Sequence, residues 1–414
     1  MGTRLLASGL AALALAGCGG GGAAEKKPPE AKLSAEAQKA IDELDASARP
    51  PDDAADIQRL LSERARALEA EDVLALSATA IGRQRARDRR SALRAKRLAI
   101  ERIRFVPEDL QTTGHHARIA VTMSYRVRGM RRPFLTSRRI LARKKSVGWR
   151  VTSDKPRSEP LPWEVHPFHA LRSRHVVLLA PRGMDAAPLR SGLERAYREI
   201  RRDLPRRDLP PSVLVIAAKD ARQAEQLTGR IASGVVAIAN VSVEWGPPPA
   251  LAVERVLAQR LIVVVDRWRT QDAAARQSTL VHEMTHTALD PDTSARTPPW
   301  LAEGVAMYVS NDDRSVEARA RASGLAPSVR LRRLCKPNSI FRLRGSKQDG
   351  AYAVSSAAAE TIVARRGNKG LFKLYDAFND SRIPGRPGAR TTDRVLRRTL
   401  GMSLAQLDAA ATGG

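Results

Sequence analysis

The sequence contains little cysteine, few aromatic residues and no long apolar run. Its 414 residues include two cysteines, Cys18 and Cys335, so at most one intramolecular disulfide can form. Aromatic residues make up 4% of the chain, which weakens any interpretation based on stacking of nucleotide bases. Because no internal run of roughly 18 apolar residues occurs, no helix is expected to span a membrane. The hydrophobic content of 43% is typical of a globular chain, here long enough for two or three domains.

The first residues have the pattern of an export signal. Arg4 precedes an apolar stretch, Leu5–Ala16, which is too short to span a bilayer and ends in small residues. Residues 15–18, Leu-Ala-Gly-Cys, resemble a bacterial lipobox, which implies removal of residues 1–17, lipid attachment at Cys18 and a location on the outer face of the bacterial cell membrane. The alternative is an ordinary signal peptide with an incidental cysteine. Cys335, the remaining thiol, is expected to be a core or semi-buried residue, not a metal ligand.

The acidic residues are too few to balance the basic ones. Asp and Glu number 44 against 71 Lys and Arg, which gives a formal net charge of +27 and a pI near 11.2. Such a charge attracts anionic lipid headgroups, acidic wall polymers or nucleic acid. The basic residues are spread from end to end, however, and this spread favours solvated surfaces over a dedicated polyanion site. An exported protein also meets little nucleic acid, so no nucleic-acid partner is expected.

The N-terminal half changes from helical to strand periodicity. Residues 18–34 are rich in Gly, Lys, Pro and Ala and predict a flexible tether. Helical spacing predicts helices over residues 34–46, from Asp52 to about Leu68, and over the very basic stretch 82–96. Alternation of apolar and polar residues then predicts half-buried antiparallel strands. These expected strands are Ala99–Phe105, Ala117–Val127, Ser137–Arg143 and Gly148–Thr152.

Helices followed by such a meander resemble the NTF2-like family, a cystatin-like α+β cone. The resemblance implies an NTF2-like domain over residues 35–153. Cones of this family hold a ligand pocket or mediate pairing, so an accessory or substrate-presenting role is expected here. The proline-rich segment 154–172 is predicted to be a linker.

The C-terminal half, residues 173–410, combines a small sheet with helices and predicts an α+β arrangement. After the last strand comes a long helix, then a short one, and the rest of the chain is expected to be mostly helical. The expected strands are His175–Ala180, Ser212–Ala218, a strand or hairpin over 234–243, and Leu261–Asp266. The expected helices are Pro188–Arg202, Gln271–Leu289 and Trp300–Val309.

The long helix carries the motif His-Glu-x-x-His. His282 and His286 are four residues apart, so a helix places both imidazoles on one face, about one turn apart. Two imidazoles in that arrangement can bind one Zn²⁺ at about 2.0–2.1 Å each. Glu283 is one step round the helix, where its carboxylate can act as a general base on a zinc-activated water. The alternative is a pair of ordinary core or surface histidines, but burial of histidine side chains without partners on an apolar helix would cost stability.

A third ligand is expected downstream, because a catalytic zinc site has three protein ligands and one open position. Glu303 follows His286 by 17 residues and is the one acid in an otherwise apolar segment, Pro299–Tyr308. That separation allows the chain to turn and bring a second helix back to the first. The alternative is a surface carboxylate near a helix start, where Glu is common.

Together, His-Glu-x-x-His and Trp-Leu-x-Glu-Gly-x-Ala-x-Tyr resemble the gluzincin clan of zinc peptidases, specifically the peptidase MA-like domain. The resemblance implies that His282, His286 and Glu303 ligate zinc and that Glu283 polarises the attacking water. It also implies an oxyanion-stabilising tyrosine on a later helix, for which Tyr352 is the candidate. Tyr308 is a second candidate, though a packing role suits it better.

The sequence departs from thermolysin-like gluzincins at one position. There an acid that orients a histidine lies four residues beyond the ligand glutamate, whereas here Met307 occupies that place. Asp272, Asp290 and Asp292 are alternative partners for the histidines.

The sequence therefore predicts a membrane-tethered, extracytoplasmic zinc metallopeptidase that acts on a peptide or protein substrate. The rival hypothesis is a non-catalytic envelope lipoprotein with a structural or vestigial zinc site and a ligand- or partner-binding NTF2-like domain. A third hypothesis is a polyanion-binding wall protein driven by charge, in contact with anionic lipid or wall polymer, and this role is compatible with the enzyme.

Overall fold

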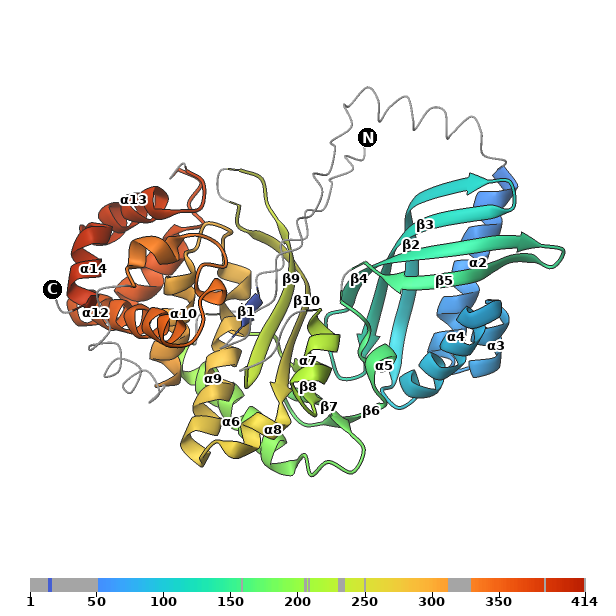
Figure 1. Cartoon of the computed structure of the whole chain (residues 1–414), viewed down its shortest axis with the longest axis horizontal. Helices are drawn as coiled ribbons and strands as arrows, with labels where there is room; N and C mark the ends of the chain where they lie inside the picture. Colours follow the sequence, from blue (N-terminus) through green and yellow to red (C-terminus); the bar gives the residue numbers. More distant parts are fainter. Residues whose placement is uncertain are drawn as a thin grey trace, which may run out of the picture. The chain divides into compact units, whose positions relative to one another are not determined.

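The computed structural model divides the chain into two compact units (Figure 1). It describes residues 51–157, 159–204, 207, 209–229, 235–248, 251–311, 329–382 and 385–412, together with the backbone of Ala14–Ala16. One unit comprises residues 22–170 and 226–229, and the other comprises residues 1–21, 171–225 and 230–414. The expected lipidation site Cys18, the expected tether and the expected helix over 34–46 lie outside the described residues.

The first unit combines helices with a four-stranded antiparallel meander in the order β2-β3-β4-β5. Burial alternates along the strands: in β3 every second residue from Ala117 to Val127 is buried. Alternation of this kind places the apolar side chains on one face of the sheet, where helix α2 packs. The elements are α2 Pro51–Glu69, α3 Val73–Ala78, α4 Gly82–Ala95, β2 Ile100–Thr113, β3 His116–Val127, β4 Phe134–Lys145 and β5 Gly148–Pro156.

The segment predicted as a linker, 154–172, contains secondary structure. Strand β5 continues through Pro156, helix α5 covers Pro162–Val165 and strand β6 covers Phe168–Arg172. Trp163 in α5 is 1% exposed and packs edge-on against Tyr125 of β3, with ring centroids 5.0 Å apart. Burial of these aromatic rings packs α5 against β3, and the boundary between the two units, after Ala170, falls inside the same segment.

The second unit is built on a six-stranded mixed sheet in the order β1-β9-β10-β8-β7-β6. Strands β7, β8 and β10 are parallel neighbours, whereas β9 runs antiparallel to β10. Strands β7 and β8 are almost wholly buried, as expected when both faces of a sheet are covered. The strands are β1 Ala14–Ala16, β7 Val176–Pro181, β8 Val213–Ala218, β9 Ala237–Trp245 and β10 Val253–Val264.

Helices supply the rest of the second unit. Helices α6, α8 and α9 share one apolar core with the sheet, and α10, α12, α13 and α14 form another. Cys335 lies in this second core, where it is 1% exposed and its thiol donates to Leu331 O at 3.2 Å. The helices are α6 Ala187–Asp203, α7 Ala221–Thr228, α8 Val265–Thr270, α9 Ala273–Leu289, α10 Pro299–Ser310, α12 Ser346–Ala377, α13 Ala389–Leu400 and α14 Leu404–Thr412; the last residues of α7, 226–228, are assigned to the first unit.

The chain is thus α+β, as the sequence predicted, with an antiparallel sheet in the first unit and a mixed sheet in the second. The helix search over the described residues finds none that is both long and apolar enough to cross a membrane.

Candidate metal centre

Helix α9 carries the His-Glu-x-x-His motif between the two cores of the second unit. Asp272 caps its N-terminus by accepting a hydrogen bond from Ala275 N at 2.8 Å. From Ser278 to Leu289 every residue of the helix is buried. Apolar side chains such as Met284 join the sheet core, whereas Leu289 joins the core of the C-terminal helices. The motif is therefore enclosed on several sides by packed protein.

A short, well-anchored connection returns the chain from α9 to α10. The buried Arg296 side chain donates through Nη2 to the carbonyl groups of Phe378 and Asp380, just beyond α12. Thr293 Oγ1 lies 2.8 Å from the Tyr375 hydroxyl of α12. These contacts tie the connection to the C-terminal helices, and so they fix where α10 begins relative to α9.

Gly304 allows α10 to pack closely against α12. A Cβ atom at this position would lie 2.4 Å from the Ser355 carbonyl oxygen and 3.3 Å from Ala359 Cβ. No side chain larger than hydrogen fits there without movement of one helix. The glycine follows Glu303 directly, so this close approach sets the position of the Glu303 carboxylate.

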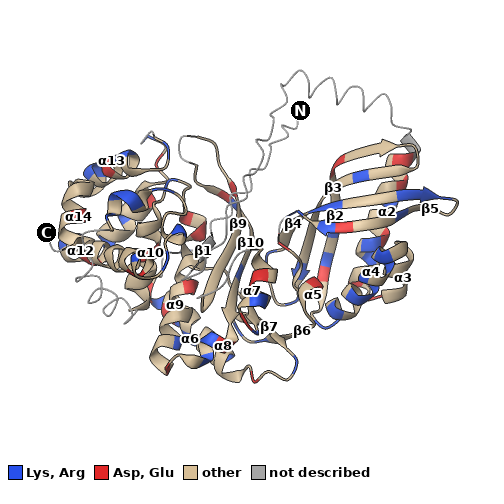
Figure 2. Ribbon diagram, viewed as in Figure 1, with Lys and Arg blue, Asp and Glu red and all other residues tan. Residues whose placement is uncertain are grey.

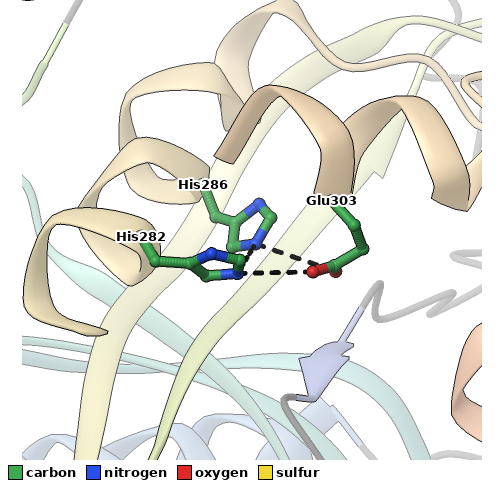
Figure 3. Close-up of side chains that lie close together, drawn as sticks. All are labelled: His282, His286 and Glu303. Carbon is green, nitrogen blue, oxygen red and sulfur yellow. Dashed lines mark hydrogen bonds and ion pairs between the residues drawn. The ribbon is translucent and has the colours of Figure 1, made fainter. Parts of the chain in front are cut away.

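Three side chains converge between α9 and α10 (Figure 3). His282 Nε2 lies 3.2 Å from His286 Nε2 and 3.3 Å from Glu303 Oε2, and His286 Nε2 lies 3.7 Å from Glu303 Oε1. Donors bound to one tetrahedral zinc ion at about 2.0–2.1 Å lie about 3.4 Å apart. The separations in this cluster match that value, so two imidazoles and one carboxylate fit a zinc ion.

The cluster is buried and incompletely hydrogen-bonded. His286 and Glu303 are each 1% exposed, and His282 is 6% exposed. Within the described part of the chain, Glu303 Oε1 accepts no hydrogen bond, although it faces His286. Burial, together with the neighbouring His282, lowers the pKa of His286 well below its usual range, which keeps the ring neutral and able to bind a cation. A buried carboxylate with an unused lone pair is well suited to a metal ion.

The Glu283 carboxylate contacts the sheet. Its Oε2 accepts a hydrogen bond from Ala239 N on β9 at 2.6 Å, and the residue is 4% exposed. Ala239 lies opposite Leu15 of the short edge strand β1 and opposite Leu261 of β10. The contact was not predicted from sequence, because it joins residues 44 positions apart. It places the carboxylate beside β9.

The remaining predicted residues occupy other positions. Tyr352 lies on α12, buried in the core that contains Trp300, and its assignment as an oxyanion donor stays a prediction. The Tyr308 hydroxyl donates to Asn368 Oδ1 at 2.7 Å, which supports a packing role. Met307 is buried in the same core as Tyr352.

The acids considered as histidine partners are engaged elsewhere. Asp272 caps α9, and Asp292 pairs with Arg207 at 2.8 Å. Asp290 Oδ2 accepts from Gln259 Nε2 at 2.6 Å, and burial raises the pKa of Asp290 to about 7. The structure therefore provides no evidence that any of these three orients His282 or His286.

Comparisons with known proteins give distant similarities. No family model matches the chain, and no curated protein matches its sequence. Among solved structures, an NTF2-like protein with a cystatin-like fold from Novosphingobium aromaticivorans is 16% identical, covers 31% of this chain and 90% of its own length, and has a TM-score of 0.21.

An M1 zinc metallopeptidase from Deinococcus radiodurans is 14% identical, covers 66% of this chain and 59% of its own length, and has a TM-score of 0.33. The same peptidase bound to a Tyr-Ser-Ala substrate is 10% identical, covers 72% of this chain and 90% of its own length, and has a TM-score of 0.33. The interpretation of the site therefore depends on the geometry of its own side chains.

Proposed function

We propose that this protein is a zinc-dependent hydrolase that cleaves peptide bonds. The observation that carries the proposal is the buried convergence of His282, His286 and Glu303 at separations that suit one zinc ion. A bound zinc ion would supply Lewis acidity and would lower the pKa of water towards about 7.

Glu283 is the proposed general base. It follows His282 on α9, and its carboxylate reaches the backbone of β9 at Ala239. In that position it can accept a proton from the attacking water and then donate the proton to the leaving amine. The Tyr352 hydroxyl is proposed as a hydrogen-bond donor to the developing oxyanion.

The edge of β9 supports a peptide as the substrate. The backbone of Ala14–Ala16 pairs antiparallel with β9, with Leu15 opposite Ala239, which is the residue that contacts Glu283. An extended peptide on this edge would use main-chain hydrogen bonds and would pass the general base. Cleavage before Cys18, which we also propose, would remove Ala14–Ala16 and leave β9 as the edge strand for a substrate.

The proposed location is the outer face of the bacterial cell membrane, with a lipid anchor on Cys18. The net charge of +27 suits a position near anionic lipid or an acidic wall polymer.

The test combines metal analysis with a peptide-library cleavage assay. We expect about one zinc ion per wild-type chain and cleavage that a chelator abolishes and zinc restores. Glu283→Gln should keep zinc but lose at least about 10³-fold in rate, because an amide cannot act as a base. Glu303→Gln should weaken zinc binding instead. Glu254→Gln, at an exposed position on β10, is the matched control and should behave like the wild type.

Two results would contradict the proposal. Full activity in Glu283→Gln would exclude the proposed base. Stoichiometric zinc without any chelator-sensitive cleavage would favour the non-catalytic lipoprotein with a structural zinc site.

A further inference from the structure

The first unit contains a pocket of about 360 Å³ that is separate from the metal centre. One face of α4, the end of β5, the proline-rich segment after it and helix α5 form its walls. The volume lies within the range of about 300–1,000 Å³ that is usual for small-molecule sites.

The face that α4 turns to this pocket is polar. Gln84, Asp88 and Ser91 recur at the spacing of one helix face, and Gln84 and Asp88 are each 4% exposed. A helix face directed at a protein interior is ordinarily apolar. Here Gln84 and Asp88 bond to each other and to Asp154 N and Arg64, so this face joins a polar network beside the pocket.

A buried ionic network forms the base of the pocket. Arg64 bonds to Asp88 at 2.7 Å and to Asp154 at 3.3 Å, and Arg138 bonds to Asp154 at 2.7 Å and to Glu164 at 2.6 Å. Both arginine side chains are 2% exposed. Because the three carboxylates are already paired with buried guanidinium groups, they do not leave the pocket acidic.

The mouth of the pocket is basic. Arg87, Arg90, Arg94 and Lys155 line it, and the lining residues include no acid beyond those of the buried network. Arg94 donates to the Glu164 carbonyl at 3.0 Å, whereas Arg87, Arg90 and Lys155 form no ion pair with any residue in the described ranges. Figure 2 shows Lys and Arg concentrated on α4.

The lining also includes apolar residues. Pro156 and Pro160 line the pocket, and the Trp163 ring is 1% exposed and held in place by its contact with Tyr125. A pocket lined by both cations and prolines is suited to a ligand that has an anionic end and an apolar body.

We infer that this pocket binds a small molecule in which one oxyanion, a phosphate or a carboxylate, is joined to an apolar body. Arg87, Arg90 and Lys155 hold the oxyanion, and the apolar wall of Pro156 and Pro160 contacts the body. The basic stretch of α4, which composition alone interprets as a solvated face, thereby acquires a specific role.

Calorimetric titration of the full chain tests the inference with three probes: phenyl phosphate, benzoate and inorganic phosphate. We expect phenyl phosphate or benzoate to bind more tightly than inorganic phosphate, and the tighter of the two identifies the oxyanion. Binding should weaken as salt is raised.

The double variant R87Q/R90Q removes two exposed cations from the mouth and should weaken binding roughly tenfold or more, because charge-assisted hydrogen bonds are lost. The double variant R85Q/R89Q removes the same charge from exposed positions of α4 that do not line the pocket, and it should bind like the wild type.

Three results would overturn the inference. One is no binding of any probe at millimolar concentration. Another is an equal loss of affinity in the two double variants, which would indicate a general charge effect. The third is binding of inorganic phosphate as tight as that of phenyl phosphate and benzoate, which would exclude the role of the apolar wall.

Discussion

The substitution Gly304→Ala tests how closely the metal centre depends on the packing of α10 against α12. The added Cβ would meet the Ser355 carbonyl oxygen at 2.4 Å, whereas ordinary van der Waals contact begins at 3.4 Å. The helices must therefore separate by about 1 Å, because the obstacle is backbone and cannot rotate away. Overpacking of this kind costs up to about 3 kcal/mol. Alanine returns about 1 kcal/mol through its higher helix propensity.

The expected net loss is about 2 kcal/mol, equivalent to a fall in Tm of roughly 4–8 °C for a unit of this size. A movement of about 1 Å also exceeds the tolerance of about 0.5 Å within which a ligand set works. Because Glu303 precedes Gly304, we expect zinc affinity to fall roughly tenfold or more. Thermal unfolding in chelator measures the first effect, and competition with a chromogenic chelator measures the second.

Gly350→Ala on α12 is the matched control for this substitution. Its added Cβ would meet Val329 Cγ2, a side-chain atom, at 3.3 Å, so the side chain can adjust and helix propensity should dominate. We expect this variant to equal the wild type in zinc affinity and to be no less stable. If Gly304→Ala keeps both wild-type stability and wild-type affinity, then the contact with Ser355 does not set the position of Glu303.

Two further predictions concern buried charges. The pKa of Asp290 is raised from 3.8 to about 7, so the folded state retains a proton that the unfolded chain has lost, and stability should fall as pH rises through this window. Asp290→Asn should remove this decline in the free energy of unfolding, which amounts to a few kcal/mol because one pKa unit is worth about 1.4 kcal/mol. Urea unfolding of the wild type and the variant at pH 4.5 and 7.5 measures the difference. The same change in stability between the two pH values in both proteins would contradict the prediction. Arg64→Met should destabilise the first unit by about 3–5 kcal/mol, because it leaves Asp88 and Asp154 buried and short of a partner. Chemical unfolding followed by tryptophan fluorescence, to which Trp149 and Trp163 of the first unit contribute, measures this change, and Arg85→Met, at an exposed position of α4, is the control.

The parts of the site that could be predicted from sequence follow from local geometry. A spacing of four on an apolar helix places His282 and His286 together whatever surrounds them. The apolar setting of Glu303 likewise predicts a buried carboxylate, and the structure places it against both histidines. The requirement for glycine at position 304 can be recognised only once the partner helix is known. It arises from close approach to the carbonyl group of Ser355, which is 51 residues away in the chain.

Other features depend on contacts that have no local signal. Arg64 and Arg138 are basic residues in a chain rich in exposed arginine, yet both are buried by partners up to 90 residues away. The same limit applies to Trp163, within the segment 154–172 expected as a linker: the boundary between the units does fall in this segment, after Ala170, but the burial of the ring has no local signal. Composition predicts the average environment of a residue type, whereas these residues are exceptions to the average.

The orientation of the proposed zinc ligands is achieved here mainly by packing. A ligating histidine usually donates its second ring nitrogen to a carboxylate or carbonyl. His286 Nδ1 is buried without a hydrogen-bond partner among the described residues, and Asp290, four residues further along the chain, bonds to Gln259 instead. The two Nε2 atoms nevertheless face each other at 3.2 Å, so the enclosed helix itself holds the rings in position. In other metal sites, loss of such a hydrogen-bond partner lowers metal affinity about 10–100-fold. We therefore expect this site to bind zinc less tightly, by about that factor, than a site with carboxylate–histidine pairs. It follows that substitutions in the packing around α9 and α10, more than substitutions of nearby acids, should control how well the site holds its metal.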